Sequence, residues 1–158
     1  MLYGPHIAQT AAEATAVIRI TVSRAEIQRV MGPAYRELMD AVAAQGIATA
    51  GPWFTHHLRI PDDTFDFEVG VPVTAPVAAT GRVQPGELRA AMVARTIHRG
   101  PYEGLPAAWG EFAAWIAAQG QRPAAELWER YLAGPESGAD PAAWRTELNR
   151  PLVRTSRR

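Results

Sequence analysis

The chain has 158 residues, and 47% of them are hydrophobic, which suits one compact domain or two small halves that share a core. Its 16 basic and 16 acidic residues give a formal net charge of zero, so direct binding to nucleic acid or to an anionic membrane is not expected. The chain contains no cysteine, which excludes disulfides, thiolate metal sites and cysteine nucleophiles. Neither a secretory signal nor an apolar run approaching about 20 residues is visible, and we therefore expect a cytoplasmic protein that does not enter the membrane.

The first half of the chain is predicted to form a strand, a helix and two further strands. Alternating apolar residues and turn signals place these elements at residues 15–22, 24–45, 53–60 and 64–73. Ser23 and Glu26 form a capping-box pattern that favours a helix start near Arg24. Gly32-Pro33 is expected to interrupt this helix, which restarts with the proline in its first turn and ends at Gly46.

The second half of the chain repeats this order after a polar connection at residues 81–86. Its predicted elements are a strand-like segment at 88–99, a helix at about 106–119, a strand at 126–132 and a last strand at 144–153. A loop rich in glycine and proline, at residues 134–141, separates the last two strands.

The two halves also match in sequence. Ala43-Ala44-Gln45-Gly46 recurs as Ala117-Ala118-Gln119-Gly120. Keeping that offset, and shifting it after the longer second loop, pairs Phe54 with Trp128, Thr55 with Glu129, His57 with Tyr131, Glu68 with Glu147 and Pro72 with Pro151. This agreement predicts a duplicated β-α-β-β unit. Because each half has too few strands to stand alone, we expect antiparallel sheets related by a pseudo-twofold axis, with a ligand groove between the repeats.

The predicted boundaries make residues 1–158 one domain. Repeat one covers about residues 15–75, and repeat two covers about residues 86–154. Residues 1–12 and 154–158 are expected to be flexible termini.

Glu129 is the strongest candidate for a functional residue. Side chains alternate along a strand, which places Leu127, Glu129 and Tyr131 on one face and Trp128, Arg130 and Leu132 on the other. A carboxylate among apolar and aromatic neighbours is paired, shifted in pKa or kept for a ligand. The alternative to a ligand-binding role is an ion pair with a basic residue such as Arg130 or Arg145, as part of the scaffold.

Several segments, in their order and spacing, resemble one known family. They are His98-Arg-Gly-Pro-Tyr102, the helix that contains Trp109, Leu127-Trp-Glu-Arg-Tyr131, the Gly134-Pro135 loop, the C-terminal segment 146–152, and segment 65–73 in the first half. Together they are similar to the GyrI-like small-molecule-binding domain, which is also the effector-binding domain of AraC- and MerR-type regulators. The resemblance extends from about Thr15 to Val153.

This resemblance implies a duplicated α+β fold of the SHS2 type, with helices on one side of the sheets. It also implies a groove lined by aromatic residues and a functional glutamate, and Glu129 stands at that position. In regulators of the family the groove binds lipophilic, often cationic drugs. Other members are single-domain proteins linked to modulation of gyrase or to hydrolysis of cyclopropane-bearing genotoxins.

The candidate ligand-binding residues are Glu129, Tyr131, Tyr102, Trp109, Trp53, His57 and Phe67. Aromatic rings beside the carboxylate would supply stacking and cation–π contacts, each worth about 0.5–2 kcal/mol. Tyr102 either projects its hydroxyl toward a ligand or caps the core as an aromatic at the strand end. His56-His57 with His98 are only a weak signal for a metal site, because adjacent strand residues point to opposite faces and cannot easily bind one ion, and we expect neither a metal nor another cofactor.

Three functions remain open. The first is the binding of a hydrophobic drug or toxin, cationic or electrophilic, for sequestration, sensing or resistance, with Glu129 as the polar anchor. The second is a hydrolase that detoxifies a strained electrophile, in which Glu129 and Tyr102 are the catalytic residues and Glu129 activates water. The third is an interaction with gyrase or with a regulator as the protein partner. The sequence does not indicate an oligomeric state.

Overall fold

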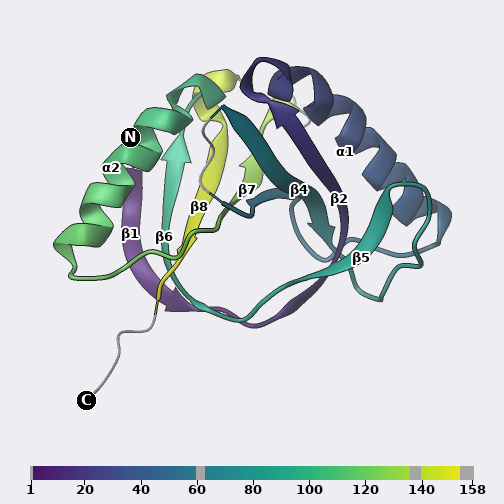
Figure 1. The fold of residues 1–158 in the computed structure, drawn as a ribbon, viewed down its shortest axis with the longest axis horizontal. Helices are drawn as coiled ribbons and strands as arrows, with labels where there is room; N and C mark the ends of the chain where they lie inside the picture. Colours follow the sequence, from purple (N-terminus) through teal and green to yellow (C-terminus); the bar gives the residue numbers. More distant parts are fainter. Residues whose placement is uncertain (1, 60–62, 136–139, 154–158) are drawn as a thin grey trace. The chain divides into compact units, whose positions relative to one another are not determined.

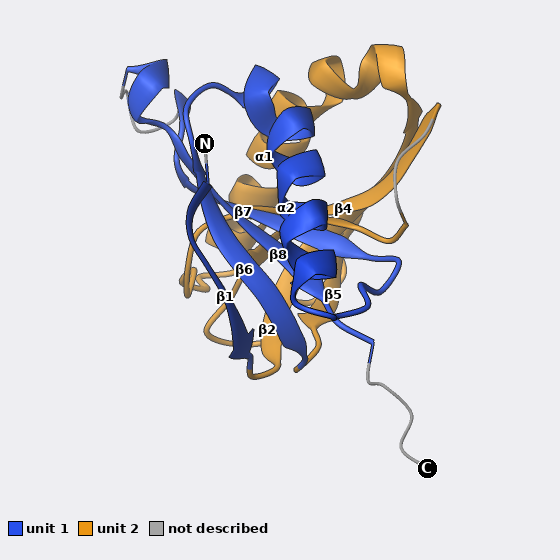
Figure 2. Ribbon diagram, turned by 90° about the vertical axis from the view of Figure 1, so that its left-hand side faces the viewer, with its two compact units in different colours: residues 1–10, 91–158 blue, residues 11–90 orange. Residues whose placement is uncertain are grey.

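The computed structural model describes residues 2–59, 63–135 and 140–153, and these residues fall into two compact units. One unit is formed by residues 11–90, and the other by residues 1–10 together with residues 91–158 (Figure 2). Each unit carries an antiparallel sheet and one long helix, so the chain is α+β, as predicted. No helix in the described ranges is long and apolar enough to cross a membrane.

The 11–90 unit contains strands β2 to β5. In chain order its elements are β2 (Glu13–Ser23), the short 3₁₀ turn η1 (Arg24–Glu26), α1 (Ile27–Ala44), β3 (Phe54–His57), β4 (Thr64–Pro72) and β5 (Val83–Leu88). Within the unit the strand order is β3-β4-β2-β5, with every pairing antiparallel. Helix α1 runs along the sheet of this unit (Figure 1). It buries Ala34, Leu38 and Val42 in a core with the inward side chains of this sheet.

The other unit repeats this architecture with β1 and β6 to β8. Its elements are β1 (Leu2–Gln9), β6 (Met92–Arg99), the 3₁₀ turn η2 (Tyr102–Gly104), α2 (Leu105–Ala118), β7 (Leu127–Ala133), the 3₁₀ turn η4 (Pro141–Ala143) and β8 (Arg145–Pro151). Its strand order is β1-β6-β8-β7. Helix α2 packs Leu105, Ala108, Phe112 and Ile116 against Ala94 and Leu148 of the sheet.

The ladder registers agree with the predicted alignment of the two halves. Opposite pairs in the 11–90 unit are Phe54–Gly70, Thr55–Val69, His56–Glu68 and His57–Phe67, and those in the other unit are Trp128–Asn149, Glu129–Leu148, Arg130–Glu147 and Tyr131–Thr146. Each pair of the first set becomes a pair of the second when the two predicted offsets are applied. This agreement supports a duplication, whereas the pseudo-twofold axis and the groove between the repeats stay predictions.

The interruption of the first helix at Gly32-Pro33 is wrong. Helix α1 runs without a break through Pro33, although an internal proline costs about 3 kcal/mol. Pro33 is exposed, whereas the next residue, Ala34, is fully buried against the sheet. The packing of Ala34, Leu38 and Val42 therefore outweighs the hydrogen bond that the proline removes.

Two segments expected to lack structure form strands. Leu2–Gln9, assigned to a flexible terminus, is β1 and pairs with β6, with an irregularity between Tyr3 and His6. Residues 83–88, assigned largely to a polar connection, are β5 and pair with β2. Both strands lie beside one neighbour within their own unit, where Pro5 and Pro85 are tolerated because one side of the strand needs no ladder hydrogen bonds. The other expected flexible terminus, 154–158, lies outside the described residues, as do residues 60–62 at the predicted connection between the strands 53–60 and 64–73.

Candidate functional site

Glu129 lies on the face of its sheet that packs against helix α2. It is directly opposite Leu148 in the β7–β8 ladder, and Leu148 is fully buried in the core cluster that α2 forms with this sheet. Only 9% of the surface of Glu129 is exposed. The sheet pattern thus places an ionisable side chain in a predominantly apolar core, as the alternation along the strand predicts.

Two neutral donors hold the Glu129 carboxylate. The indole Nε1 of Trp109, on α2, donates a hydrogen bond to Oε2 at 2.6 Å. The hydroxyl of Tyr131, two residues along β7, donates to Oε1 at 2.7 Å. Both carboxylate oxygens are therefore engaged, one from the helix and one from the same strand. Because the indole N–H can only donate, Oε2 acts as an acceptor whether or not the acid carries a proton.

Burial raises the pKa of Glu129 above its ordinary value of 4.5. The apolar surroundings disfavour the charged form, and this effect exceeds the opposing hydrogen bonds from Trp109 and Tyr131 and the influence of His98. Glu129 therefore holds its proton more tightly than an exposed glutamate. Such a group can accept a cation in place of the proton, or act as a general acid or base.

Aromatic rings flank the tyrosine that binds Glu129. The ring of Tyr102, in η2, meets Tyr131 edge to face at a centroid distance of 5.7 Å and lies 4.8 Å from the ring of Trp144. Tyr102 and Trp109 are both partly buried against the core of this unit. The packing of Tyr102 agrees with its role as an aromatic at the strand end, and it also puts its ring in contact with Tyr131, which donates to Glu129.

His98 supports the turn that carries Tyr102. Its imidazole is buried, and Nε2 lies 3.2 Å from the carbonyl oxygen of Pro101. A side chain at Gly104 would meet the same ring, since an added Cβ would lie 3.0 Å from Cε1 of His98. Sequence reasoning weighed His98 only as a weak metal ligand and took Trp144 only as the start of a strand. The His98–Tyr102 motif could have identified His98, because the family resemblance already includes this segment.

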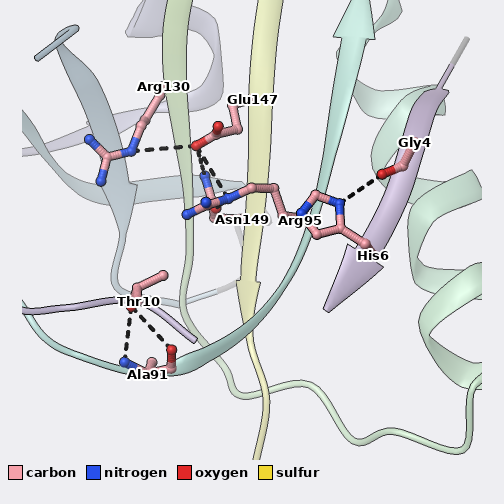
Figure 3. A network of polar contacts seen from close by, with 8 residues as sticks. All are labelled: Gly4, His6, Thr10, Ala91, Arg95, Arg130, Glu147 and Asn149. Atoms are coloured by element: carbon pink, nitrogen blue, oxygen red, sulfur yellow. Dashed lines mark hydrogen bonds and ion pairs between the residues drawn. The ribbon is translucent and has the colours of Figure 1, made fainter. Parts of the chain in front are cut away.

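An ion pair between Glu129 and Arg130, the alternative role, does not form. Arg130 lies on the opposite face of the sheet, where its Nε is 3.5 Å from Oε1 of Glu147 (Figure 3). The same oxygen is 3.5 Å from Nε of Arg95 and accepts a hydrogen bond from Asn149 at 3.0 Å. The carboxylate that neutralises Arg130 and Arg95 is thus Glu147, and Glu129 is left with its two neutral donors.

The candidate residues of the first half belong to the other unit. Phe67 is fully buried there, and the imidazole of His57 stacks on it at a centroid distance of 5.1 Å. Trp53 packs against the core of that unit and lies 4.9 Å from the ring of Tyr35. Burial, reinforced by the neighbouring His56, lowers the pKa of His57 to about 4, so this imidazole is neutral near pH 7. Of the predicted set, the structure brings together Glu129, Tyr131, Tyr102 and Trp109.

Several solved structures superpose on this chain at low sequence identity. The C-terminal domain of EcmrR superposes with a TM-score of 0.85 at 22% identity, covering 98% of this chain and 100% of that domain. In the EcmrR–DNA complex, the matched region covers 96% of this chain and 58% of the EcmrR chain, with 21% identity and a TM-score of 0.83.

Two further structures cover nearly the whole chain. SAV2435 bound to tetraphenylphosphonium has a TM-score of 0.67 and 15% identity, and the match covers 96% of this chain and 94% of SAV2435. A hydrolase from Listeria innocua has a TM-score of 0.64 and 14% identity, with 94% and 91% covered. At these identities the likeness shows the fold alone.

No curated protein sequence matches the chain significantly. The model of the GyrI-like small molecule binding domain, in contrast, matches residues 5–152, which is nearly the whole sequence. This match accords with the α+β fold and with the segments that carry the sequence resemblance. The chain therefore belongs to the GyrI-like small molecule binding domain family.

Proposed function

We propose that this protein binds a hydrophobic cation and that Glu129 is the anionic anchor of the site. The observation that carries the proposal is the buried carboxylate held by Trp109 and Tyr131. A charged group in an apolar core is costly, and it is retained where a partner of opposite charge repays that cost. The rings of Trp109 and Tyr131 stand at the carboxylate, and Tyr102 lies beside Tyr131, so cation–π and stacking contacts are available to the same ligand.

When the cation binds, it takes the place of the proton on Glu129. A positive ligand beside Glu129 favours the charged form of the acid and therefore lowers a pKa that burial has raised. Over the pH range in which the free acid keeps its proton, each binding event releases part of a proton to the solvent. A neutral ligand of the same shape would bind without this release, which separates recognition of charge from recognition of shape.

The test uses tetraphenylphosphonium, the compound bound to SAV2435, as a probe. Isothermal titration of the wild type in two buffers with different ionisation enthalpies measures both the affinity and the number of protons released. Glu129→Gln is expected to weaken binding about tenfold or more and to abolish proton release. Glu111→Gln, which removes the same charge from the exposed side of α2, is the matched control and should bind as the wild type does. Equal affinities for the wild type and Glu129→Gln would reject the anchor role.

Hydrolysis of a strained electrophile is the second candidate function, and the raised pKa of Glu129 favours it. A glutamate that keeps its proton nearer neutral pH can donate it to a leaving group or, once ionised, take one from water. Incubation with a cyclopropane-bearing alkylator followed by mass spectrometry distinguishes this function from binding. A water adduct made by the wild type and not by Glu129→Gln indicates an enzyme, whereas recovery of the intact compound indicates a binding module.

The remaining expectations rest on the family resemblance and on composition. Modulation of gyrase would depend on an exposed surface and should survive Glu129→Gln. The DNA complex of EcmrR concerns that regulator, of which the present chain matches only part. That this chain makes no direct contact with nucleic acid is a prediction from its zero formal net charge.

A further inference from the structure

Two arginines that take no part in the Glu129 site are directly opposite each other on neighbouring strands. Arg99 at the end of β6 is directly opposite Arg145 at the start of β8, and both side chains are exposed. They lie on the face of the sheet opposite Glu129, because the next opposite pair, His98 and Thr146, points to the α2 side. Together with Asp140, Ala142 and Ala143 they line a surface pocket of about 400 Å³.

Like charges directly opposite in an antiparallel ladder repel each other, so this pair costs stability unless an anion lies between them. The carboxylate next along β8 on the same face is Glu147, which is engaged by Arg95 and Arg130 (Figure 3). Asp140 accepts the backbone N–H of Ala142 at 3.1 Å. Among the described residues, no carboxylate forms an ion pair with Arg99 or Arg145.

The 11–90 unit provides an internal comparison at the same ladder position. The alignment that pairs Glu68 with Glu147 also pairs Asp66 with Arg145. The residue opposite Asp66 in the β2–β4 ladder is Thr21, as Arg99 is the residue opposite Arg145 in the β6–β8 ladder. There the Asp66 carboxylate receives two hydrogen bonds from Arg19, at 3.1 and 3.0 Å, and one from Thr21 at 3.4 Å. The position is therefore satisfied internally in one unit, whereas in the other unit an arginine replaces the acid.

We propose that Arg99 and Arg145 form a binding site for a phosphate-type oxyanion, such as inorganic phosphate or the phosphate of a small phosphomonoester. Guanidinium groups bind such anions through paired N–H donors, and two of them on adjacent strands can grip one tetrahedral group from two sides. The guanidinium of Arg99 also contacts the ring of Tyr3 on β1, with its central carbon 4.9 Å from the ring centroid. The pocket volume suits an anion of this size with room for an attached organic group.

Asp140 influences which anions the pocket prefers. Its carboxylate leaves the lining with one excess positive charge, two from the arginines and one negative from the aspartate. Repulsion from Asp140 weakens the binding of a dianion, unless the anion carries a hydrogen that the second carboxylate oxygen can accept. Asp140→Asn removes the charge and keeps an oxygen for the Ala142 N–H, so it should bind inorganic phosphate more tightly than the wild type.

The experiment measures inorganic phosphate binding to the full chain by calorimetry and by the rise in melting temperature, against sodium chloride at equal ionic strength. Arg99→Gln and Arg145→Gln should each weaken phosphate binding about tenfold or more. Arg145→Asp places an acid at the position that Asp66 occupies in the other unit and directly opposite Arg99, so it should abolish phosphate binding and raise the melting temperature in phosphate-free buffer by pairing with Arg99. Arg36→Gln, at an exposed position of α1, is the charge-matched control.

The proposal is overturned if phosphate binds the wild type no better than chloride does. It is also overturned if Arg36→Gln weakens phosphate binding as much as Arg99→Gln, because the effect would then reflect net charge alone. Arg145→Asp keeps the proposal testable even if a glutamine variant folds poorly, since a gain in melting temperature with loss of phosphate binding requires a folded protein. None of these variants touches Glu129, so their outcome is independent of the cation site.

Discussion

The indole of Trp109 donates to Glu129 across 20 residues of sequence, from helix α2 to strand β7, at 2.6 Å. Tyr131 donates to the other oxygen of the same carboxylate at 2.7 Å. The helix and the sheet of this unit are thus joined by a polar contact within an otherwise apolar core. Each donor lowers the pKa that burial raises. Because Trp109 is on α2, the protonation state of Glu129 depends on the position of that helix.

Trp109→Phe is expected to destabilise the fold by about 1–3 kcal/mol, because it keeps most of the ring but leaves Oε2 of a buried acid without its donor. Loss of this hydrogen bond should also raise the pKa of Glu129 further. Urea denaturation measures the stability change. Trp115→Phe, on the same helix, is the matched control, and a similar loss in both variants would mean that ring volume, and not the hydrogen bond, carries the effect.

Glu129→Gln should change how stability depends on pH. Below the ordinary pKa of 4.5, the acid is protonated in both the folded and the unfolded chain. Between 4.5 and the raised pKa of the folded state, the unfolded chain releases a proton that the folded chain retains, so wild-type stability falls as pH rises. The glutamine variant lacks this loss and should gain stability relative to the wild type over that interval.

Urea denaturation of the wild type and Glu129→Gln between pH 4 and pH 8 tests this expectation, with the exposed Glu111→Gln as the control. A constant difference in unfolding free energy between the wild type and Glu129→Gln across that range would contradict it. Combined with weaker binding of tetraphenylphosphonium, a gain in stability would show that the buried acid is kept for function at the expense of the fold.

The face on which Glu129 lies could be predicted from the sequence, because a strand places residues i and i+2 on the same side. This rule alone predicted that Tyr131 lies on the same face as the Glu129 carboxylate. The contact with Trp109 could not be predicted in the same way, since it depends on the distance and rotation of α2 above the sheet. The sequence placed Trp109 among the candidate ligand-binding residues, and in the structure its ring is partly buried while its N–H donates to the acid.

The strands β1 and β5 were missed for a related reason. Each contains glycine and proline, which local rules associate with turns. Each is also held by pairing with a strand that is distant in sequence, β1 with β6 and β5 with β2. The break at Pro33 was predicted from local propensity, and burial of Ala34 overrides it. Local patterns thus predicted the elements that carry their own periodicity, and tertiary pairing determined the others.

His57 is expected to make the fold sensitive to acid. Its pKa is about 4 in the folded state and 6.5 ordinarily, so between these values the unfolded chain binds a proton that the folded chain does not. Stability is therefore lost as pH falls from 6.5 toward 4, by at most about 3 kcal/mol. His57→Phe keeps an aromatic ring on Phe67 and should lose less stability between pH 7 and pH 4.5.

Chemical denaturation at those two pH values measures the effect, and His6→Gln, at an exposed position of β1, is the control. If His57→Phe and the wild type lose equal stability on acidification, the imidazole does not carry the acid sensitivity.

Gly70 and Gly110 should respond in opposite directions to the same substitution. A Cβ at Gly70 would lie 2.8 Å from Cε1 of Phe54 and 3.0 Å from Cγ1 of Val17, two buried side chains of the same unit. Gly70→Ala is therefore expected to destabilise the fold by about 1–3 kcal/mol through overpacking. At Gly110, in an exposed turn of α2, no atom lies within 4 Å of the added Cβ, and Gly110→Ala should stabilise the helix by about 1 kcal/mol.

Thermal and urea denaturation of the two alanine variants measure this contrast directly. Because both changes add one methyl group, and reduce the freedom of the unfolded chain by a similar amount, the difference between them reports the packing around Phe54. Equal effects at the two positions would mean that Phe54 can turn away from the new methyl group at little cost. A loss confined to Gly70→Ala would instead show that this β3–β4 pair requires a glycine, because the ring of Phe54 lies over the position that a side chain would fill.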